Sequence, residues 1–231
     1  MNIEKYAKFA PQYYTGEAPK ILLRLFKNHK FDSILDCGCG DGSILYALNK
    51  EGLLGNLKVN AIDLSKDRIE IVKRNFPKFN AKVDSAETMN SIGDNSQDLV
   101  ISTQVIEHVD DEKMTTSFNR VLKDKGTVYL STVFKKWYGW YFYKNNTGWV
   151  LDPTHLREYT NDEQLTNLLK KFFTINVSNK TTQRFPLIDF ITKRLGVSIK
   201  KRDNLFWKTI RALRIPILGY YNWELVLTKK K

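Results

Sequence analysis

The sequence predicts an α/β fold: one open, mostly parallel seven-stranded sheet with helices on both faces. Short apolar runs alternate with segments of helical spacing along most of the chain, which is typical of a parallel sheet covered by helices. The chain has 231 residues, of which 42% are hydrophobic and 27% charged. This is enough apolar sequence for one sizeable core. We therefore expect a single domain over residues 1–231.

Apolar runs bounded by turn residues predict the strands, and periods near 3.6 predict the helices. Ser65 is expected to cap one helix, Pro77 to end it, and Gly126 to close the helix before the fifth strand. Thr160, with Glu163 three residues later, predicts a capping box. The expected strands are 33–36, 58–63, 80–83, 98–102, 127–133, 172–178 and 221–228, and the expected helices are 18–27, 43–50, 65–76, 110–123 and one that begins at Thr160.

Two segments do not fit this alternation and are expected to be peripheral insertions. Residues 134–159 are rich in aromatic side chains and follow the fifth strand, and residues 181–215 are basic and lie between the last two strands. Neither has the period of a sheet strand or of a long amphipathic helix throughout. We expect the first to form an aromatic lid and the second a basic amphipathic segment.

The strongest local signal is the glycine-rich turn LDCGCGDG, residues 35–42, which follows a strand and opens a helix. Such a turn lets the backbone approach a ligand closely, which is the nucleotide-binding pattern of open α/β sheets. The turn could alternatively bind a phosphate, but Asp36 and Asp41 flank it and would repel an anion. A nucleoside with a cationic extension, such as S-adenosylmethionine, is therefore favoured. Asp63 ends the next strand and can accept both hydroxyls of a ribose.

Residues 31–134 resemble the class I S-adenosylmethionine-dependent methyltransferases, in the branch of the ubiquinone-pathway O-methyltransferases. The matching stretches are LDCGCGDG, NAIDLS at 60–65, VDSAETM at 83–89, QDLVISTQVIEHV at 97–109 and LKDKGTVYLSTV at 122–133. The resemblance implies a Rossmann-like methyltransferase fold and S-adenosylmethionine as cofactor. It also implies cofactor contacts by Asp36, Gly38, Gly40 and Gly42 around the methionine portion, Asp63 at the ribose, Asp84, Ser85 and Ala86 at the adenine, and Gln104 near the methyl donor, with Leu64 as a further cofactor-binding residue. Family members often have Asp where this chain has Ser85. Either Asp84 or Ser85 is therefore expected to contact the adenine.

The candidates for the chemistry are Glu107, His108 and His155. Histidine is the side chain whose ordinary pKa suits proton transfer near neutral pH. Some relatives carry a Glu-x-x-Glu-His metal motif with a later His, and here the first position is Gln104. One Glu and two His form a candidate divalent-metal site, with weaker affinity for a hard ion such as Mg²⁺. The alternative is that Glu107 and His108 cap a loop while His155 hydrogen-bonds locally. Arg157, in the same loop as His155, is a candidate for binding a carboxylate or phosphate of the substrate.

The net charge of +12 is concentrated near the end of the chain, since residues 184–231 hold 12 Lys+Arg against three Asp+Glu. The segment WYGWYFY, residues 137–143, is flanked by Lys135, Lys136 and Lys144. Aromatic rings with flanking lysines suit an anionic membrane surface, but they also suit base stacking or the wall of an apolar pocket. We expect an anionic membrane to be contacted through 135–144 and 193–214, with RNA as the alternative partner.

Composition excludes several classes of protein. Two cysteines cannot make a disulfide scaffold or a zinc finger, and no apolar run approaches the length of a membrane span. No signal peptide is visible at the N-terminus, so a cytoplasmic, peripherally membrane-associated protein is expected. The expected function is methyl transfer to a hydroxyl of an amphipathic or lipid-linked small molecule or glycan. The alternatives are an RNA methyltransferase and a binding module that has lost its chemistry.

Overall fold

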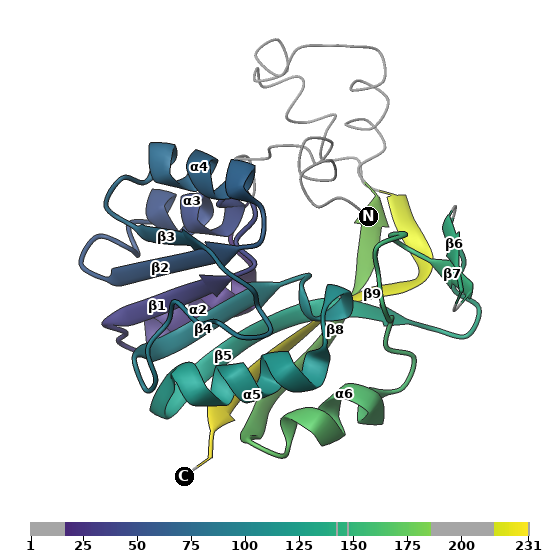
Figure 1. Cartoon of the computed structure of the whole chain (residues 1–231). Helices are drawn as coiled ribbons and strands as arrows, with labels where there is room; N and C mark the ends of the chain where they lie inside the picture. The colour runs from purple at the N-terminus through teal and green to yellow at the C-terminus, as the bar shows by residue number, and fades with distance from the viewer. Residues whose placement is uncertain (1–16, 142, 147, 186–214, 231) are drawn as a thin grey trace, which may run out of the picture.

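The computed structural model describes residues 17–141, 143–146, 148–185 and 215–230. They form a seven-stranded sheet in the order β3-β2-β1-β4-β5-β9-β8 and a separate two-stranded hairpin, β6-β7 (Figure 1). The strands are β1 (Ser33–Cys37), β2 (Lys58–Asp63), β3 (Asn80–Val83), β4 (Gln97–Thr103), β5 (Leu122–Lys135), β6 (Tyr143–Asn145), β7 (Gly148–Val150), β8 (Phe173–Phe185) and β9 (Ile215–Lys229). The helices are α2 (Lys20–Asn28), α3 (Ser43–Lys50), α4 (Lys66–Asn75), α5 (Asp111–Val121), α6 (Asp162–Leu169) and the short 3₁₀ helix η1 (Ile106–His108).

The sheet is mostly parallel, as predicted. Strands β1 to β5 run parallel to one another, and β9 pairs antiparallel with both β5 and β8. The carboxyl ends of β1, β2 and β4 therefore meet at one edge. In open α/β sheets this edge is where ligands bind.

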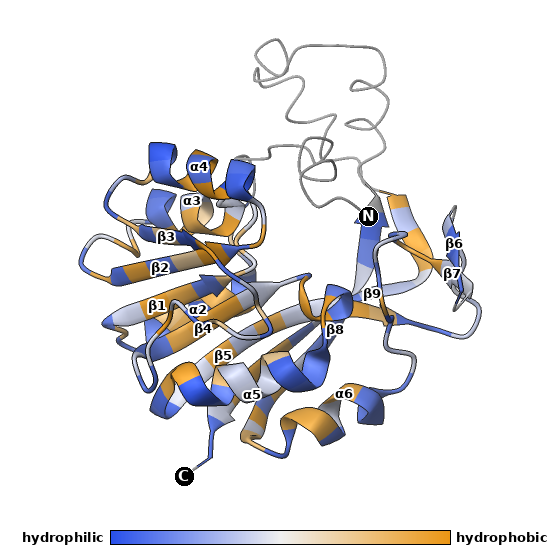
Figure 2. Ribbon diagram, viewed as in Figure 1, coloured by the Kyte–Doolittle hydropathy of each residue, from blue (hydrophilic) through white to orange (hydrophobic). Residues whose placement is uncertain are grey.

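The core has two halves, one on each face of the sheet. Ile34 and Leu35, neighbours in β1, are both fully buried but belong to opposite halves. Helices α2, α3 and α4 pack on the half that contains Ile34, and α5 and α6 pack on the half that contains Leu35. Figure 2 shows apolar colour running through the strands between these helix layers. Burial on both faces explains why the parallel strands are continuous apolar runs rather than alternating ones.

The helix expected over 110–123 is shorter than predicted, because β5 begins earlier. Helix α5 ends at Val121, and Leu122 already pairs with Gln97 of β4. Gly126 lies inside β5 and does not close the helix. A Cβ atom there would lie 2.8 Å from Cδ2 of Leu122, so the glycine is needed for close packing within the irregular start of the strand. Sheet pairing outweighs the local turn signal at this boundary.

Two helix starts differ slightly from the prediction. Helix α2 begins at Lys20, after Pro19, rather than at 18. The capping box of α6 is formed by Asn161 and Gln164, one residue after the predicted pair. Asn is as good an N-cap as Ser and better than Thr. The predicted cap of α4 is confirmed, since the Ser65 side chain accepts a hydrogen bond from the backbone N–H of Arg68 at 3.3 Å.

The last two strands are longer than predicted and extend into the segment expected to be the basic insertion. Strand β8 continues to Phe185 and β9 begins at Ile215, with Arg184 paired to Pro216. Residues 181–185 are therefore sheet. Residues 186–214, which include the expected membrane-contacting segment 193–214, lie outside the described residues.

The aromatic insertion expected over 134–159 begins inside the sheet. Strand β5 continues to Lys135, and Phe134 bridges to Tyr159 at the far end of the segment. Between them the chain forms a turn and the β6-β7 hairpin. No helix in the described part of the chain is long and apolar enough to span a membrane.

Candidate active site

The glycine-rich turn needs its glycines. Gly38, Gly40 and Gly42 have φ values of 73°, 56° and 87°, in the left-handed region that disfavours side chains. A Cβ atom on Gly38 would lie 2.4 Å from Cγ2 of Val105, so the loop after β4 packs directly against the turn. The turn is thus held between β1 and the loop that carries the candidate catalytic residues.

Replacing Gly38 with Ala is expected to destabilise the fold through this contact. Gly52 is a matched control, because it has the same φ of 73° and a Cβ there would meet nothing within 4 Å. Gly52→Ala should cost about 1–2 kcal/mol of unfolding free energy from backbone strain alone. Gly38→Ala should cost about 1–3 kcal/mol more because of overpacking. Urea unfolding of both variants measures the difference, and equal losses would contradict the packing argument.

Asp36 is fully buried in β1, and neither of its carboxylate oxygens has a hydrogen-bond partner among the described residues. Burial, together with the nearby charge of Asp63, raises its pKa to about 7. An unpartnered carboxylate of this kind requires a donor or a positive charge from a ligand. Asp63 accepts hydrogen bonds from the backbone N–H groups of Gly40 and Ser65, each at 2.9 Å. Two carboxylates at a glycine turn fit a cationic ligand rather than a phosphate.

The residues predicted at the adenine and ribose lie around the same edge. The oxygens of Asp84 accept backbone N–H groups of Ser85 and Ser91, each at 2.7 Å. Burial works to raise the pKa of Asp84, but these hydrogen bonds outweigh it and hold the pKa below its ordinary value. Leu64 is 45% exposed and Ala86 is buried. The choice between Asp84 and Ser85 as the adenine contact stays a prediction.

Gln104, expected near the methyl donor, directly follows β4 and has an unusual backbone conformation. Its φ is 55°, and its backbone N–H donates to the carbonyl of Ser131 at 2.9 Å. Its side-chain Nε2 donates to Oδ1 of Asn222 on β9 at 3.0 Å. The side chain is therefore held toward β9, a partner that the sequence did not indicate.

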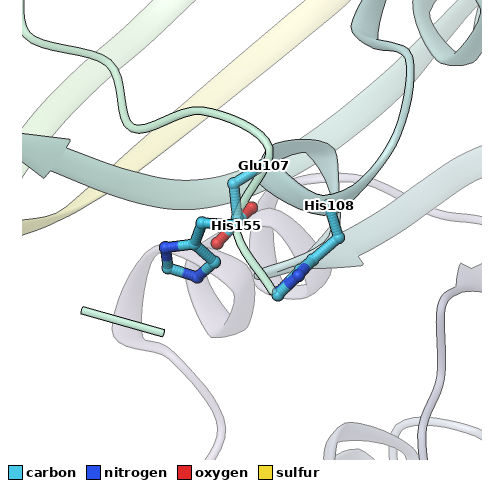
Figure 3. A group of neighbouring side chains, drawn as sticks. All are labelled: Glu107, His108 and His155. Atoms are coloured by element: carbon cyan, nitrogen blue, oxygen red, sulfur yellow. The ribbon is translucent and has the colours of Figure 1, made fainter. Parts of the chain in front are cut away.

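Glu107, His108 and His155 come together although 47 residues separate the last two in sequence. Their possible ligand atoms all lie within 4.8 Å of one another, and Figure 3 shows the three side chains gathered at one place. The loop that carries His155 is held there because the N–H groups of Leu156 and Arg157 donate to the carbonyl of Glu107, at 2.9 and 3.3 Å. The sequence prediction that these three residues form one group agrees with this geometry.

Glu107 is completely buried. Its Oε2 accepts the hydroxyl of Thr132 at 3.0 Å, and its Oε1 has no partner among the described residues. Burial raises its pKa to about 7. Burial, and then the neighbouring His155, also hold the pKa of His108 below its ordinary value. A neutral imidazole next to a buried carboxyl is a ready proton acceptor or metal ligand.

Outer hydrogen bonds orient both imidazoles. Nδ1 of His155 lies 2.6 Å from Oε1 of Glu158, which is itself buried. Nδ1 of His108 lies 3.0 Å from Oγ1 of Thr154, whose hydroxyl donates to Asp152 at 2.6 Å. Each Nδ1 therefore carries its proton toward an acceptor, which leaves both Nε2 lone pairs free. Carboxylate or hydroxyl partners of this type are characteristic of histidines that bind metals.

Sequence reasoning missed Thr132, Thr154 and Glu158, although the spacing of three between His155 and Glu158 was a usable signal. The expectation that Arg157 binds substrate fits the structure poorly. Its guanidinium donates to the carbonyls of Ile106 and Val109 and lies 3.6 Å from Asp111. Arg157 instead holds η1, and with it Glu107 and His108, in place.

Comparisons with known proteins agree with the fold and the glycine turn. Residues 35–130 match a family model described as a methyltransferase domain. The chain is 26% identical over 164 residues to a ubiquinone biosynthesis O-methyltransferase of Bartonella quintana, covering 65% of this chain and 62% of that protein. It is 37% identical over 82 residues to the tRNA N(3)-methylcytidine methyltransferase trm140 of Schizosaccharomyces pombe, covering 36% and 26%. The chain thus spans less than two thirds of the length of these curated relatives.

Solved structures share the fold at low sequence identity. The protein PH0226 of Pyrococcus horikoshii OT3 has a TM-score of 0.62 at 16% identity, covering 98% of this chain and 99% of that one. Geranyl diphosphate methyltransferase, solved in complex with S-adenosylmethionine, has a TM-score of 0.57 at 14% identity, covering 87% and 78%. The (4+2)-cyclase SpnF has a TM-score of 0.63 at 18% identity, covering 94% and 85%. These likenesses concern the fold alone.

The sheet order and the glycine turn agree with the family match over residues 35–130, and all three support a class I S-adenosylmethionine-dependent methyltransferase. The match to this family over residues 35–130 implies S-adenosylmethionine as the cofactor. The site fits that cofactor, because the unpartnered Asp36 and the three glycines of the turn suit a nucleoside with a positively charged methionine portion. The two curated relatives have names that specify different acceptors, so they do not define the acceptor of this chain.

Proposed function

We propose that the chain transfers the methyl group of S-adenosylmethionine to a hydroxyl of an amphipathic or lipid-linked small molecule or glycan. The observation that carries this proposal is the group formed by Glu107, His108 and His155, of which the first two lie in the loop that packs on the glycine turn. Methyl transfer to a hydroxyl requires an oriented nucleophile that loses its proton. The free Nε2 atoms and the unpartnered Oε1 of Glu107 provide acceptors for that proton or for a metal that binds the oxygen.

We further propose that these three residues hold a divalent metal ion. Two imidazoles and one carboxylate form a donor set typical of Zn²⁺ and other first-row transition metals rather than of Mg²⁺. Glu158 and Thr154 supply the outer hydrogen bonds that such histidines usually have. When bound, the ion would lower the pKa of a coordinated hydroxyl. The chain's own contribution is to fix the two rings, exclude water around Glu107 and keep its carboxylate ready to ionise.

We propose that the protein binds an anionic membrane, where it reaches the acceptor, through an aromatic surface. This surface is made of Trp137, Trp140, Tyr143 and Trp149. These side chains are 90%, 58%, 48% and 46% exposed. No Asp or Glu occurs from 135 to 151, whereas three lysines do. Tryptophan and tyrosine rings with neighbouring lysines suit the headgroup region of an anionic bilayer.

The aromatic surface is firmly attached to the sheet, which supports a docking role. A Cβ atom on Gly219 would lie 2.4 Å from the Cα of Gly139, so the turn before Trp140 touches the β9 backbone directly. The N–H of Lys136 donates to the carbonyl of Gly219 at 2.8 Å. Leu218, the residue before Gly219 in β9, is itself 71% exposed. Rigid exposed apolar groups of this extent usually mark an interaction site.

One experiment tests the acceptor and the membrane together. The protein is incubated with methyl-labelled S-adenosylmethionine and vesicles of phosphatidylcholine and phosphatidylglycerol that carry a lipid extract of the source cell. We expect the protein to sediment with the vesicles and label to enter the lipid fraction. The double variant Trp137→Ser/Trp140→Ser should bind the vesicles at least about tenfold more weakly. Each ring contributes about 1.5–3 kcal/mol to binding when it is buried in the membrane.

The control variant is Tyr46→Ser, which removes an exposed aromatic ring on α3 and should leave sedimentation unchanged. Label that enters added RNA and not lipid would contradict the acceptor class. Equal sedimentation of the double variant and the wild type would contradict the docking surface. Calorimetry with S-adenosylmethionine is run in parallel, and a lack of binding would remove the proposed activity altogether.

A further inference from the structure

A groove of about 920 Å³ lies on the α2 face of the sheet, between that helix and strands β5, β8 and β9. Helix α2 packs over the middle of this face through Leu22 and Leu25, and the groove opens beside it. The floor is formed by side chains of β8 and β9 that point away from the α5 and α6 layer. The groove is thus separate from the group formed by Glu107, His108 and His155.

The floor contains a buried carboxylate. Glu224 lies in the middle of β9, lines the groove and is 7% exposed. Its Oε1 accepts the hydroxyl of Tyr129 at 2.6 Å, and the ion pairs found among the described residues do not include it. A buried carboxylate with a neutral donor is poorly compensated and favours further hydrogen-bond donors from a ligand.

Amide and hydroxyl groups surround Glu224 on the same face. Asn179 of β8 and Ser131 of β5 are its partners in register. Asn222, two residues before Glu224, and Thr181 opposite it also line the groove. These side chains both donate and accept hydrogen bonds. Val177 and Val226 line the same groove. A floor with one carboxylate among amides, hydroxyls and these apolar side chains suits a ligand that carries several hydroxyl groups on a carbon ring.

The rim of the groove is basic. The sequence of α2 is KILLRLFKN, with three cations and no acid. Lys20 and Arg24, one turn apart, both line the groove and are exposed. Lys and Arg in this arrangement bind a phosphate oxygen well. The groove therefore combines an anion-binding rim with a hydroxyl-binding floor.

The groove is connected to the predicted position of the methyl donor by one hydrogen bond. Asn222 lines the groove and accepts from Nε2 of Gln104 at 3.0 Å. Gln104 is the residue expected near the methyl group, and it lies three residues before Glu107. A ligand that lies along β9 in the groove therefore has one end next to this asparagine.

We propose that the groove binds a phosphorylated sugar, which is the polar part of the methyl acceptor. Glu224 and its amide neighbours hold the sugar hydroxyls, and Lys20 and Arg24 hold the phosphate. This inference rests on the proposed transfer to a hydroxyl and deepens it by naming the acceptor class. The same chemistry occurs in a free sugar phosphate and in the headgroup of a lipid-linked sugar.

Calorimetric titration with glucose 1-phosphate, mannose 1-phosphate and galactose 1-phosphate tests the site. We expect at least one of them to bind saturably, and glucose and inorganic phosphate to bind at least about tenfold more weakly. Glu224→Gln, which keeps the shape and an acceptor for Tyr129, should weaken binding by about tenfold or more. Arg24→Ala, on the exposed side of α2, should do the same without disturbing the sheet. Glu70→Gln on α4, whose partner is the exposed Lys73, is the control and should bind like the wild type.

Failure of all three sugar phosphates to bind, or binding that survives both Glu224→Gln and Arg24→Ala, would overturn the proposal. Equal affinity for inorganic phosphate would overturn it as well, because the floor would then contribute nothing. Titration with S-adenosylhomocysteine measures the cofactor site separately. A wild-type protein that binds a sugar phosphate but not S-adenosylhomocysteine would argue against the proposed function and not against the groove. Vesicles that carry a polyprenyl-phosphate-linked mannose identify the source of the ligand, since tighter binding than to free mannose 1-phosphate indicates a lipid headgroup.

Discussion

The variant Asp36→Asn is expected to lose most of its affinity for S-adenosylmethionine while it keeps its fold. Asp36 is buried, and both its oxygens lack partners among the described residues. A hydrogen bond between charged groups contributes about 1.5–3 kcal/mol. Its loss should lower the affinity for S-adenosylmethionine by about ten- to hundredfold, as measured by calorimetry at pH 8. The neutral amide keeps the size of the side chain, so the glycine turn should stay in place.

The same variant should change how the cofactor-free protein responds to pH. Burial and Asp63 raise the pKa of Asp36 from 3.8 to about 7 in the folded chain. The folded state therefore keeps a proton that the unfolded state has already released, and stability falls as the pH rises from about 4 to 7. Above pH 7 the loss is complete, on the order of a few kcal/mol. Asp36→Asn removes this loss, so at pH 8 its melting temperature without cofactor should equal or exceed that of the wild type.

Asp32→Asn is the matched control, since Asp32 is exposed at the opposite end of β1. It should leave cofactor affinity unchanged. Cofactor affinity of the wild type should rise with pH up to about 7, as Asp36 ionises, and that of Asp36→Asn should not. An Asp36→Asn protein that binds S-adenosylmethionine as tightly as the wild type would contradict the role of this carboxylate.

The parts of the fold that were predictable depend on local signals. The glycine turn was predictable because only glycine tolerates three positive φ values within five residues. The strands β2 and β3 and helix α3 match the predicted ranges, because apolar period and turn residues agree there. The boundary between α5 and β5 was not predictable, because the pairing of Leu122 with Gln97 is a tertiary contact that overrides the signal of Gly126.

The candidate site was predictable in its central residues and not in their surroundings. Glu107 and His108 were found through a motif, and His155 through the scarcity of histidine in the chain. Glu158 and Thr154 orient the histidines through a turn whose geometry no periodicity reveals. The groove beside α2 has no sequence signal at all, because it arises where Glu224, Asn179 and Lys20 meet from distant parts of the chain.

The largest effect on turnover is expected from Glu107→Gln. Glutamine has the size of the wild-type side chain and can still accept from Thr132, but it cannot ionise. If the carboxylate is a metal ligand or a proton acceptor, its removal should lower kcat by about 100-fold or more. Calorimetry should give a cofactor affinity within about twofold of the wild type, since the glycine turn and Asp36 are untouched. Glu112→Gln on the surface of α5 is the control and should keep full activity.

Metal titration separates the two roles of the same group. If Glu107, His108 and His155 hold an ion, the wild type should bind Zn²⁺ or Mn²⁺ in a one-to-one ratio, and a chelator should abolish turnover. Glu158→Gln should then lower the affinity for the metal by about 10- to 100-fold, because it weakens the hydrogen bond that orients His155. Turnover that survives chelation but is lost in Glu107→Gln would show that the group acts as a proton acceptor alone. Normal turnover in both Glu107→Gln and His155→Ala would exclude the group from the chemistry, because the buried carboxyl and the oriented rings would then serve only to hold the loop on η1.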